Sequence, residues 1–341
     1  MGGHAVRAPS TLIGSALSGL ATVFCAANLG GCENAQREDA PERPTAATAP
    51  RATAPRSAPF AEPRLLFLPD AGDRAPPEAP FSRLTPAPQG HSLCPSDMVW
   101  VKRSYCIDRY EVALQDTRRG RALSPYYHPD PGILRSTFKT WQARAPSSKT
   151  RLGRQLSVPE PPAWELSETF DIRALSERGV VPSGYLNYTK ARQACRNAGK
   201  RLCTRQEWVT ACRGEHDTQF PYGDSYEADR CNVNRPAHPA VLLHGNASIH
   251  HLDPRLNLAE DRGKALLRRT GDTSSCGSAW GSDKVYDMVG NLDEWIEDPQ
   301  GMFVGGFFSR ATKEGCEAAI SSHPPEYYDY SLGARCCLTP H

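Results

Sequence analysis

Residues 287–295, DMVGNLDEW, combine the residue types and spacing that could most readily support chemistry. Three carboxylates, those of Asp287, Asp293 and Glu294, surround a Gly-Asn pair that interrupts regular structure. Carboxylates beside buried tryptophan are costly unless a partner balances their charge. The residues alone leave three interpretations open: a catalytic acid pair, a metal site, or a tightly folded corner whose acids cap turns.

The twelve cysteines are a second candidate for chemistry, and they are many for a protein of a reducing compartment. Such a number indicates either disulfides formed in an oxidising compartment or a metal site. The histidines add little. His216 and the pair His250 and His251 lie in irregular segments without ligand spacing, so we interpret them as lone surface residues.

The N-terminal segment favours an oxidising compartment. Residues 11–31, TLIGSALSGLATVFCAANLGG, are apolar, small and uncharged, which is typical of a signal peptide rather than of a membrane-spanning helix. The sequence LGGC at residues 29–32 resembles a bacterial lipobox, in which Cys32 is lipidated. An ordinary cleaved signal and an uncleaved anchor are the alternatives. We expect residues 1–32 to be a signal peptide with a lipobox, and the protein to be a lipoprotein of the bacterial cell envelope.

Composition divides the remaining chain into two parts. Residues 33–89 are rich in Pro and Ala and lack periodicity, which predicts a disordered linker. Residues 90–341 carry short alternating and helical patterns, which predict one α+β domain rich in loops. The net charge of +2 provides no basic field, so we expect no nucleic-acid partner.

Within the domain, two helices have clear boundaries. Residues 188–198 share an apolar face and end before Gly199, which suits a C-terminal cap. Residues 204–212 begin with Thr204, and Glu207 three residues later predicts a capping box. We expect residues 116–180 to be irregular and residues 213–285 to hold few regular elements. The predicted strands are 98–101, 105–112, 303–308 and 332–337.

Four motifs follow one another in a specific order. They are GKRLCTRQEW at 199–208, FPYGD at 220–224, DMVGNLDEW at 287–295, and Gly305-Gly306 followed by GARC at 333–336. This order resembles the formylglycine-generating enzyme family, also called sulfatase-modifying factor domains, over residues 92–338. The resemblance implies a C-type-lectin-like α+β fold with low secondary-structure content.

The resemblance implies a calcium site in DMVGNLDEW. In family members this turn binds calcium through the side chains of its first residue and its Glu, and through two backbone carbonyls. The corresponding ligands are Asp287, the carbonyl of Gly290, the carbonyl of Leu292, and Glu294. Calcium prefers several hard oxygen ligands, which this set supplies. Asp293 stands where the family usually has Trp.

The resemblance also implies disulfides. Once Cys25 of the signal and the lipidated Cys32 are set aside, ten cysteines remain. In disulfide-bearing relatives, the cysteine before GKRL bonds that of GFRC, and the cysteine after the second helix bonds one after the Gly-Gly strand. These correspond to Cys195–Cys336 and Cys212–Cys316, each of which should restrict the unfolded chain by about 4–5 kcal/mol. From their positions we infer three further pairs, namely Cys94–Cys106, Cys231–Cys276 and Cys203–Cys337.

The chemistry of the family belongs to the loop after Gly305 and Gly306. Its enzymes hold two cysteines there, before the structural one, whose thiolates bind Cu(I). The copper activates O₂, which oxidises a substrate cysteine to formylglycine. Here the loop reads FFSRATKEGC at 307–316, and its one cysteine is assigned to a disulfide. Ser309 and Arg310 stand near the first copper position, and neither ligates Cu(I). We therefore expect no copper cofactor.

Three hypotheses for function remain. The first is a non-catalytic module that binds a protein or glycan, with Tyr327, Tyr328 and Tyr330 either lining a groove or only packing. The second is an oxidoreductase of the formylglycine-generating type that acts on a protein cysteine with altered cofactor chemistry. The HxxxHxE pattern of iron-dependent relatives is absent from the sequence. The third is a structural envelope protein. Inserted loops often set partner choice, so we expect specificity in residues 116–180. We interpret Arg201 and Arg335 as structural, holding carbonyls or a carboxylate such as Glu207.

Overall fold

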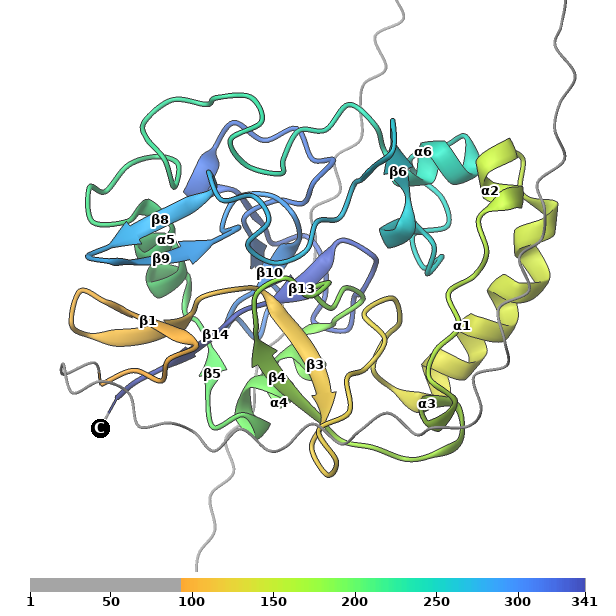
Figure 1. Ribbon diagram of the computed structural model, residues 1–341, viewed down its shortest axis with the longest axis horizontal. Helices are drawn as coiled ribbons and strands as arrows, with labels where there is room; N and C mark the ends of the chain where they lie inside the picture. Colours follow the sequence, from red (N-terminus) through yellow and green to blue (C-terminus); the bar gives the residue numbers. More distant parts are fainter. Residues whose placement is uncertain (1–92, 341) are drawn as a thin grey trace, which may run out of the picture. The chain divides into compact units, whose positions relative to one another are not determined.

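Two four-stranded sheets organise residues 93–340, the part of the chain that the computed structural model describes (Figure 1). The first has the order β1-β2-β14-β5 and is antiparallel throughout. The second has the order β12-β11-β10-β13, and β10 and β13 are parallel. The strands are Met98–Val101 (β1), Tyr105–Asp108 (β2), Cys336–Leu338 (β14), Arg201–Leu202 (β5), Ala319–Ile320 (β12), Phe303–Val304 (β11), Asp293–Trp295 (β10) and Leu332–Ala334 (β13). The predicted signal peptide, Cys32 and the predicted linker lie outside the described residues.

Three predicted strands are shorter or divided in the structure. The pattern at 105–112 becomes β2 and the beginning of a third strand, β3 (Val112–Asp116). The pattern at 332–337 is divided at Arg335, because β13 and β14 belong to different sheets. The strand expected at 303–308 ends at Val304, since Gly305 and Gly306 have φ of 93° and 79° and turn the chain away.

The two predicted helices are confirmed within a residue at their ends. Helix α4 covers Tyr188–Asn197 and buries its apolar face, and Gly199 follows its end with φ of 73°. Helix α5 covers Arg205–Arg213. Thr204 caps it, and Glu207 accepts from the backbone N–H of Thr204, which completes the capping box. These local patterns are encoded within a few residues, which is why the sequence predicts them well.

The expectation that residues 116–180 are irregular is wrong. This segment contains helices α1 (Pro131–Arg144), α2 (Arg151–Gln155) and α3 (Ala163–Ser167), and strand β4 (Ile172–Ser176), which pairs with β3. Asp130 caps α1 by accepting from two backbone N–H groups, and Pro131 occupies the first turn. Only Leu134 and Trp141 of α1 are buried, so its apolar stripe is narrow and easily missed.

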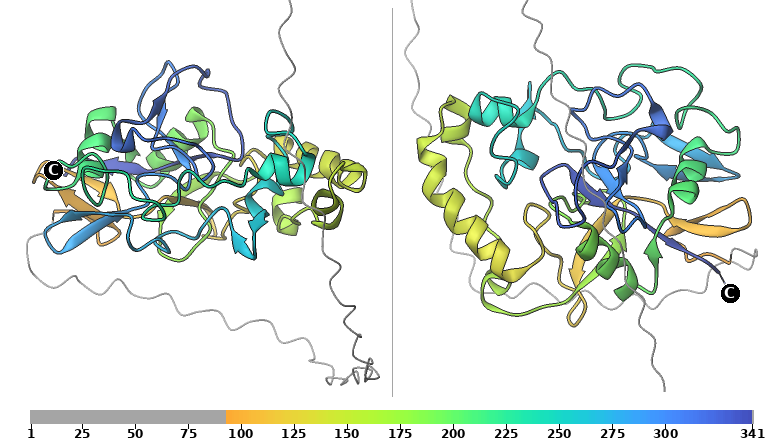
Figure 2. Two further views of the ribbon diagram at one scale, coloured as in Figure 1. Left: turned by 90° about the horizontal axis from the view of Figure 1, so that it is seen from above. Right: turned by 180° about the vertical axis from the view of Figure 1, so that it is seen from behind.

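The segment between α5 and the second sheet also holds more regular structure than expected. It contains α6 (Pro239–His244), two-residue strands β6 (Glu260–Asp261) and β7 (Lys264–Ala265), and a hairpin of β8 (Gly277–Trp280) and β9 (Asp283–Tyr286). Helices α1, α2 and α6 form one end of the described domain, and the β8–β9 hairpin with α5 lies toward the other (Figures 1 and 2). The loop-rich α+β architecture is the one predicted.

Five disulfides tie these elements together, in the same pairs that we expected. They are Cys94–Cys106, Cys195–Cys336, Cys203–Cys337, Cys212–Cys316 and Cys231–Cys276. Cys336 and Cys337 of β14 bond to α4 and to the segment before α5, respectively, so one strand is fixed on two sides. Five disulfides indicate that the domain folds in an oxidising environment. No helix within residues 93–340 has the length and apolar character needed to cross a membrane.

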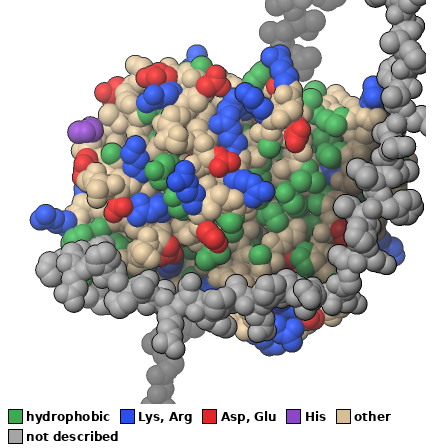
Figure 3. All heavy atoms as spheres, in the orientation of Figure 1, with side chains coloured by type: hydrophobic (Ala, Val, Ile, Leu, Met, Phe, Trp, Pro, Cys, Tyr) green, Lys and Arg blue, Asp and Glu red, His purple; other side chains and the backbone are tan. Residues whose placement is uncertain are grey.

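The surface carries both signs of charge. On the face shown in Figure 3, Lys and Arg side chains are interspersed with Asp and Glu and do not form one continuous basic field.

Candidate functional site

The DMVGNLDEW segment forms a sharp, buried corner that leads into β10. Asp287, Gly290 and Asn291 all have positive φ, of 60°, 87° and 61°. A Cβ atom at Gly290 would collide with the carbonyl oxygen of Asn232, so this position requires glycine. The N–H of Gly290 donates to the carbonyl of Gly305, which joins the corner to the loop that follows β11.

Each carboxylate of this corner has partners within the protein. The guanidinium of Arg335 contacts Glu294, with Nη2 2.9 Å from Oε1, and the indole N–H of Trp208 donates to Oε2 at 2.7 Å. Asp287 accepts a hydrogen bond from the N–H of Gly271 at 2.7 Å. The arrangement explains how Glu294 can be buried beside two tryptophans, because its charge is matched by a buried cation.

A further buried carboxylate, that of Glu111, comes from a segment distant in the sequence, between β2 and β3. It accepts from the Asn291 side chain at 2.6 Å and from the N–H of Leu292 at 3.1 Å. Burial, with Asp287 and Glu294 nearby, raises the pKa of Glu111 well above its usual value. Burial likewise raises the pKa of Asp287 to about 7. Sequence reasoning missed Glu111, because it lies far from the motif along the chain.

The charges of this corner fit a divalent cation. When ionised, Glu111, Asp287 and Glu294 carry three negative charges, and Arg335 is the guanidinium that faces them. Two positive charges would therefore bring the group to neutrality. Among residues 93–340 no group of three or more His, Cys, Asp and Glu side chains is arranged to hold a metal. A cation here therefore needs backbone carbonyls, such as those of Gly290 and Leu292 in the expected set.

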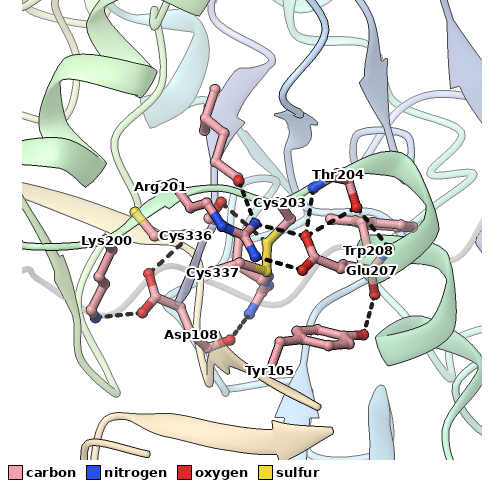
Figure 4. Close-up of a disulfide and its surroundings, with 12 residues drawn as sticks. Tyr105, Asp108, Lys200, Arg201, Cys203, Thr204, Glu207, Trp208, Cys336 and Cys337 are labelled. Carbon is pink, nitrogen blue, oxygen red and sulfur yellow. Dashed lines mark hydrogen bonds and ion pairs between the residues drawn. A yellow bond between two sulfur atoms is a disulfide. The ribbon is translucent and has the colours of Figure 1, made fainter. Parts of the chain in front are cut away.

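Arg335 and Arg201 have the structural role that we expected. Besides Glu294, Arg335 donates to the carbonyl oxygens of Asp108 and Tyr286, at 2.9 and 2.8 Å. Figure 4 shows Arg201 directed at Glu207 beside the Cys203–Cys337 disulfide, with nitrogen–oxygen distances of 2.6 and 2.7 Å. Arg335 joins segments that are distant in the sequence, and Arg201 does so through a further hydrogen bond to the hydroxyl of Thr339 at 2.9 Å.

Near Arg201, the neighbouring Lys200 pairs with a second buried carboxylate, that of Asp108. Asp108 is fully buried, and Lys200 lies 2.5 Å from its Oδ1 (Figure 4). Burial raises the pKa of Asp108 to about 6 against the opposing effect of Lys200. Its other oxygen accepts from the N–H of Cys336 at 3.0 Å, so it fixes the strand that bears two disulfides.

The loop at 307–316, where the resemblance places copper chemistry, holds an ion pair. Asp293 is fully buried, and Arg310 contacts it with Nη2 2.8 Å from Oδ2 and Nη1 2.9 Å from Oδ1. The N–H of Gly306 also donates to Asp293, at 3.0 Å. Burial still raises the pKa of Asp293 to about 7. The two residues that depart from the family pattern at this place are thus each other's partner.

The cysteines of the described domain are all used in disulfides. Cys316 at the end of the loop bonds Cys212, and the ten cysteines of residues 93–340 form five disulfides. The guanidinium of Arg310 lies over the rings of Phe303 and Phe307, 5.9 and 5.6 Å from their centroids. A soft ion such as Cu(I) needs thiolates, and this part of the structure supplies none. The residues present do not fit a copper site.

The three tyrosines that could line a groove have different roles. Tyr327 donates to Asp329 at 2.7 Å and stacks on His323, and Tyr330 is buried. Only Tyr328 lines a groove, together with α1. Tyr327 and Tyr330 therefore pack within the domain, and Tyr328 lines a groove.

The interpretation of the histidines as lone surface residues holds for His216, whereas His250 lies at the surface without being isolated and His251 is partly buried. His250 is exposed but packs against other aromatic rings, those of Trp141 and His244, with centroids 5.4 and 4.7 Å away. His251 is partly buried and contacts the carbonyl of Ala247. Loop residues 249–252 are brought against α1 by the tertiary fold, which the local sequence does not reveal.

Comparison with known protein families shows a match over most of the domain. Residues 82–337 match the family model described as sulfatase-modifying factor enzyme 1-like domain. No curated protein sequence matches the chain at a significant level.

Similarity to solved structures is low. CarF is 13% identical, with 69% of this chain and 86% of that chain covered and a TM-score of 0.32. PvdO from Pseudomonas aeruginosa is 14% identical, with 69% and 80% covered and a TM-score of 0.32. The Major Tropism Determinant P3c variant is 15% identical, with 72% and 53% covered and a TM-score of 0.35.

Proposed function

Since the chain belongs to the sulfatase-modifying factor family of formylglycine-generating enzymes, we propose that it is a member that binds a partner instead of oxidising cysteine. In this proposal the domain is an exported, calcium-stabilised binding module of the bacterial cell envelope. The five disulfides support export to an oxidising compartment.

One observation carries the proposal. At the place of the family's copper cysteines the chain has Arg310, which is paired with the buried Asp293. Removing either partner would leave the other without its counter-charge, so the pair is part of the packed structure rather than an open ligand site. The cysteine of the same loop, Cys316, is held in a disulfide and has no thiolate to offer.

We propose calcium as a structural ion at the DMVGNLDEW corner. Asp287 and Glu294 would hold it with their carboxylates, and Gly290 and Leu292 with their carbonyls. When bound, the ion supplies positive charge to a corner where three buried carboxylates face Arg335. The proposal is supported by that charge imbalance and by the positive φ angles, which fold the chain sharply around the position.

We also propose that Cys32 carries a lipid anchor, which would hold the domain at a membrane. Expression of the full chain in a bacterium fed an alkyne-labelled fatty acid tests this proposal. Label should enter the wild type and be absent from a Cys32→Ser variant. Equal labelling of both proteins would contradict it.

The lack of copper chemistry is tested by an oxidation assay. The full chain is produced with its disulfides formed, loaded with Cu(I), and incubated in air with a thiol reductant and a Cys-X-Pro-X-Arg peptide. Mass spectrometry then follows conversion of the cysteine to formylglycine, with an active family member as the positive control. We expect no conversion beyond that of copper alone. Catalytic formation of formylglycine would show that the chain is an oxidoreductase with altered cofactor chemistry.

A further inference from the structure

A groove runs along helix α1 at one end of the domain. Its larger part has a volume of about 580 Å³, and a smaller part of about 270 Å³ continues it. Trp141, Arg144 and His250 line both parts, so the two are continuous. Helix α1 has 14 residues, which gives a wall about 20 Å long at 1.5 Å per residue. That length accommodates about six residues of an extended peptide.

The two walls come from segments that are distant in the sequence. One face of α1 presents side chains at helical spacing, namely Ile133, Ser136, Thr137, Thr140, Trp141 and Arg144. The opposite wall is formed by the loop at 249–252 and by Tyr328. His250 in this loop has a φ of 62°, an uncommon conformation for a residue with a side chain. Contacts of its ring with Trp141 and His244 hold it there.

The cations at this groove have no counter-charge. Arg144 and Lys149 are exposed, and within residues 93–340 neither forms an ion pair. The residues that line the two parts include no Asp and no Glu. In contrast, the buried Arg255 behind Trp141 is fully paired, with Nη2 2.7 Å from Asp253 Oδ2. The groove therefore presents positive charge that the protein does not neutralise.

The groove also exposes aliphatic surface next to these cations. Leu252 at its edge is 40% exposed, and it is one of three exposed large hydrophobic side chains in the described part of the chain. Ile133 and Ile249 lie on opposite walls. A ligand that matches this surface combines carboxylates with a bulky apolar group.

We propose that the α1 groove binds an acidic peptide segment of another exported protein. An Asp or Glu of the peptide pairs with Arg144 and Lys149, and a large apolar side chain packs against Leu252 and Ile133. Aliphatic surface favours a peptide over an acidic glycan, since only the peptide offers bulky hydrophobic side chains at close spacing to carboxylates. This inference rests on the proposed binding function and names the ligand class.

Selection from a display library of random decapeptides tests the proposal. The full chain with its disulfides formed is the target, and enriched peptides are synthesised with a fluorescein label. Fluorescence anisotropy then gives their Kd for the wild type and for two variants. The double variant Arg144→Ala/Lys149→Ala removes the groove cations. Lys139→Ala removes an exposed lysine of the same helix that does not line the groove.

We expect enriched peptides to pair Asp or Glu with Leu, Ile or Phe. The double variant should raise their Kd about tenfold, because it removes two exposed ion pairs. The Lys139→Ala variant should stay within about twofold of the wild type. A melting curve of each variant verifies that it is folded, and Arg144→Gln/Lys149→Gln replaces the double variant if that one unfolds.

Three results would overturn the assignment. They are no enrichment of acidic peptides, an equal loss in the Lys139→Ala control, or binding of an oligogalacturonate probe through Arg144 without peptide binding. None of these results changes the outcome of the oxidation assay. They would contradict the peptide as the ligand class and leave the proposed non-oxidising function in place. Formylglycine formation in the oxidation assay would instead contradict the proposed function, and peptide binding would still be tested by the anisotropy measurements.

Discussion

The corner at 287–295 and the groove along α1 differ in whether their charged side chains are buried and paired. In the corner, Glu294 is buried and contacts both Arg335 and Trp208. In the groove, Arg144 and Lys149 are exposed and without a carboxylate in the described structure. The corner carries the residues that identify the family, and the groove is built largely from residues 116–180.

This difference in charge pairing indicates which region is available to a ligand. A buried charge without a partner costs several kcal/mol, so pairing in the corner is required for folding and indicates no activity. An exposed cation costs little, so its lack of a partner leaves it available to a ligand. A cluster of acids in a sequence is therefore weak evidence of catalysis until the partners of those acids are known.

The largest expected effect comes from removing a charge of the corner. Arg335→Ala leaves Glu294 buried beside Glu111 and Asp287 without its guanidinium partner, and we expect it to lower the free energy of unfolding by about 3–5 kcal/mol. The matched change in the groove, Arg144→Ala, should stay within about 0.5 kcal/mol of the wild type. Urea unfolding measures both. Similar losses for the two variants would remove the distinction between the regions.

Calcium should stabilise the corner and leave the groove unchanged. At a free concentration of 100 times its Kd, the ion should add about 2.7 kcal/mol to the stability of the domain. Thermal unfolding in calcium and in a chelator measures this difference. Asp287→Asn, which removes one ligand charge, should reduce the calcium effect, whereas Arg144→Ala should retain it. A melting temperature that does not respond to calcium would argue against the ion.

Removing Arg310 should show a pH-dependent loss. Without its partner, the buried Asp293 is costly when ionised, so Arg310→Ala should destabilise the domain by about 2 kcal/mol at pH 8. The loss should be smaller at pH 5, because a carboxyl whose pKa is raised to about 7 is protonated there. Unfolding curves at the two pH values give the difference. An equal loss at both would mean that Arg310 acts through packing alone.

The smallest expected effect concerns Glu165, a buried acid of helix α3. Burial raises its pKa to about 7, and one of its carboxylate oxygens accepts from the N–H of Ser124. The folded state therefore binds a proton more tightly than the unfolded state, and stability falls as pH rises from about 4.5 through 7.

Glu165→Gln should remove this part of the pH dependence, on the order of 1–2 kcal/mol between pH 5 and pH 7. The pKa values of Asp287 and Asp293 are also raised, so these two residues should maintain the rest of the decrease in stability with rising pH. Thermal unfolding of the variant and the wild type across this range measures the change. Parallel pH profiles would show that Glu165 does not titrate in this interval.

Much of the scaffold could be predicted because its determinants are local or carried by motifs. Thr204 and Glu207 form their capping box three residues apart, and the disulfide partners are marked by motifs, since Cys195 lies four residues before GKRL and Cys336 ends GARC. The fold class follows from the order of those motifs, which the sequence displays directly.

The candidate sites were harder to predict because they depend on contacts between distant segments. Glu111 reaches the corner across 180 residues of sequence to contact Asn291. The pairing of Asp293 with Arg310 follows only once β10 and the loop after β11 are packed together. Helix α1 buries only Leu134 and Trp141, so its apolar stripe is narrow, and its groove forms only when residues 249–252 pack against it.

The most direct test of the central claim is the state of the sulfur atoms. The exported full chain is alkylated under denaturing, non-reducing conditions, digested, and mapped by mass spectrometry. We predict no alkylation at the ten cysteines of residues 93–340 and recovery of the five disulfide-linked peptide pairs, including Cys212–Cys316. Alkylation of Cys316 together with another cysteine of this set would reveal free thiols that could bind Cu(I), and would contradict the account.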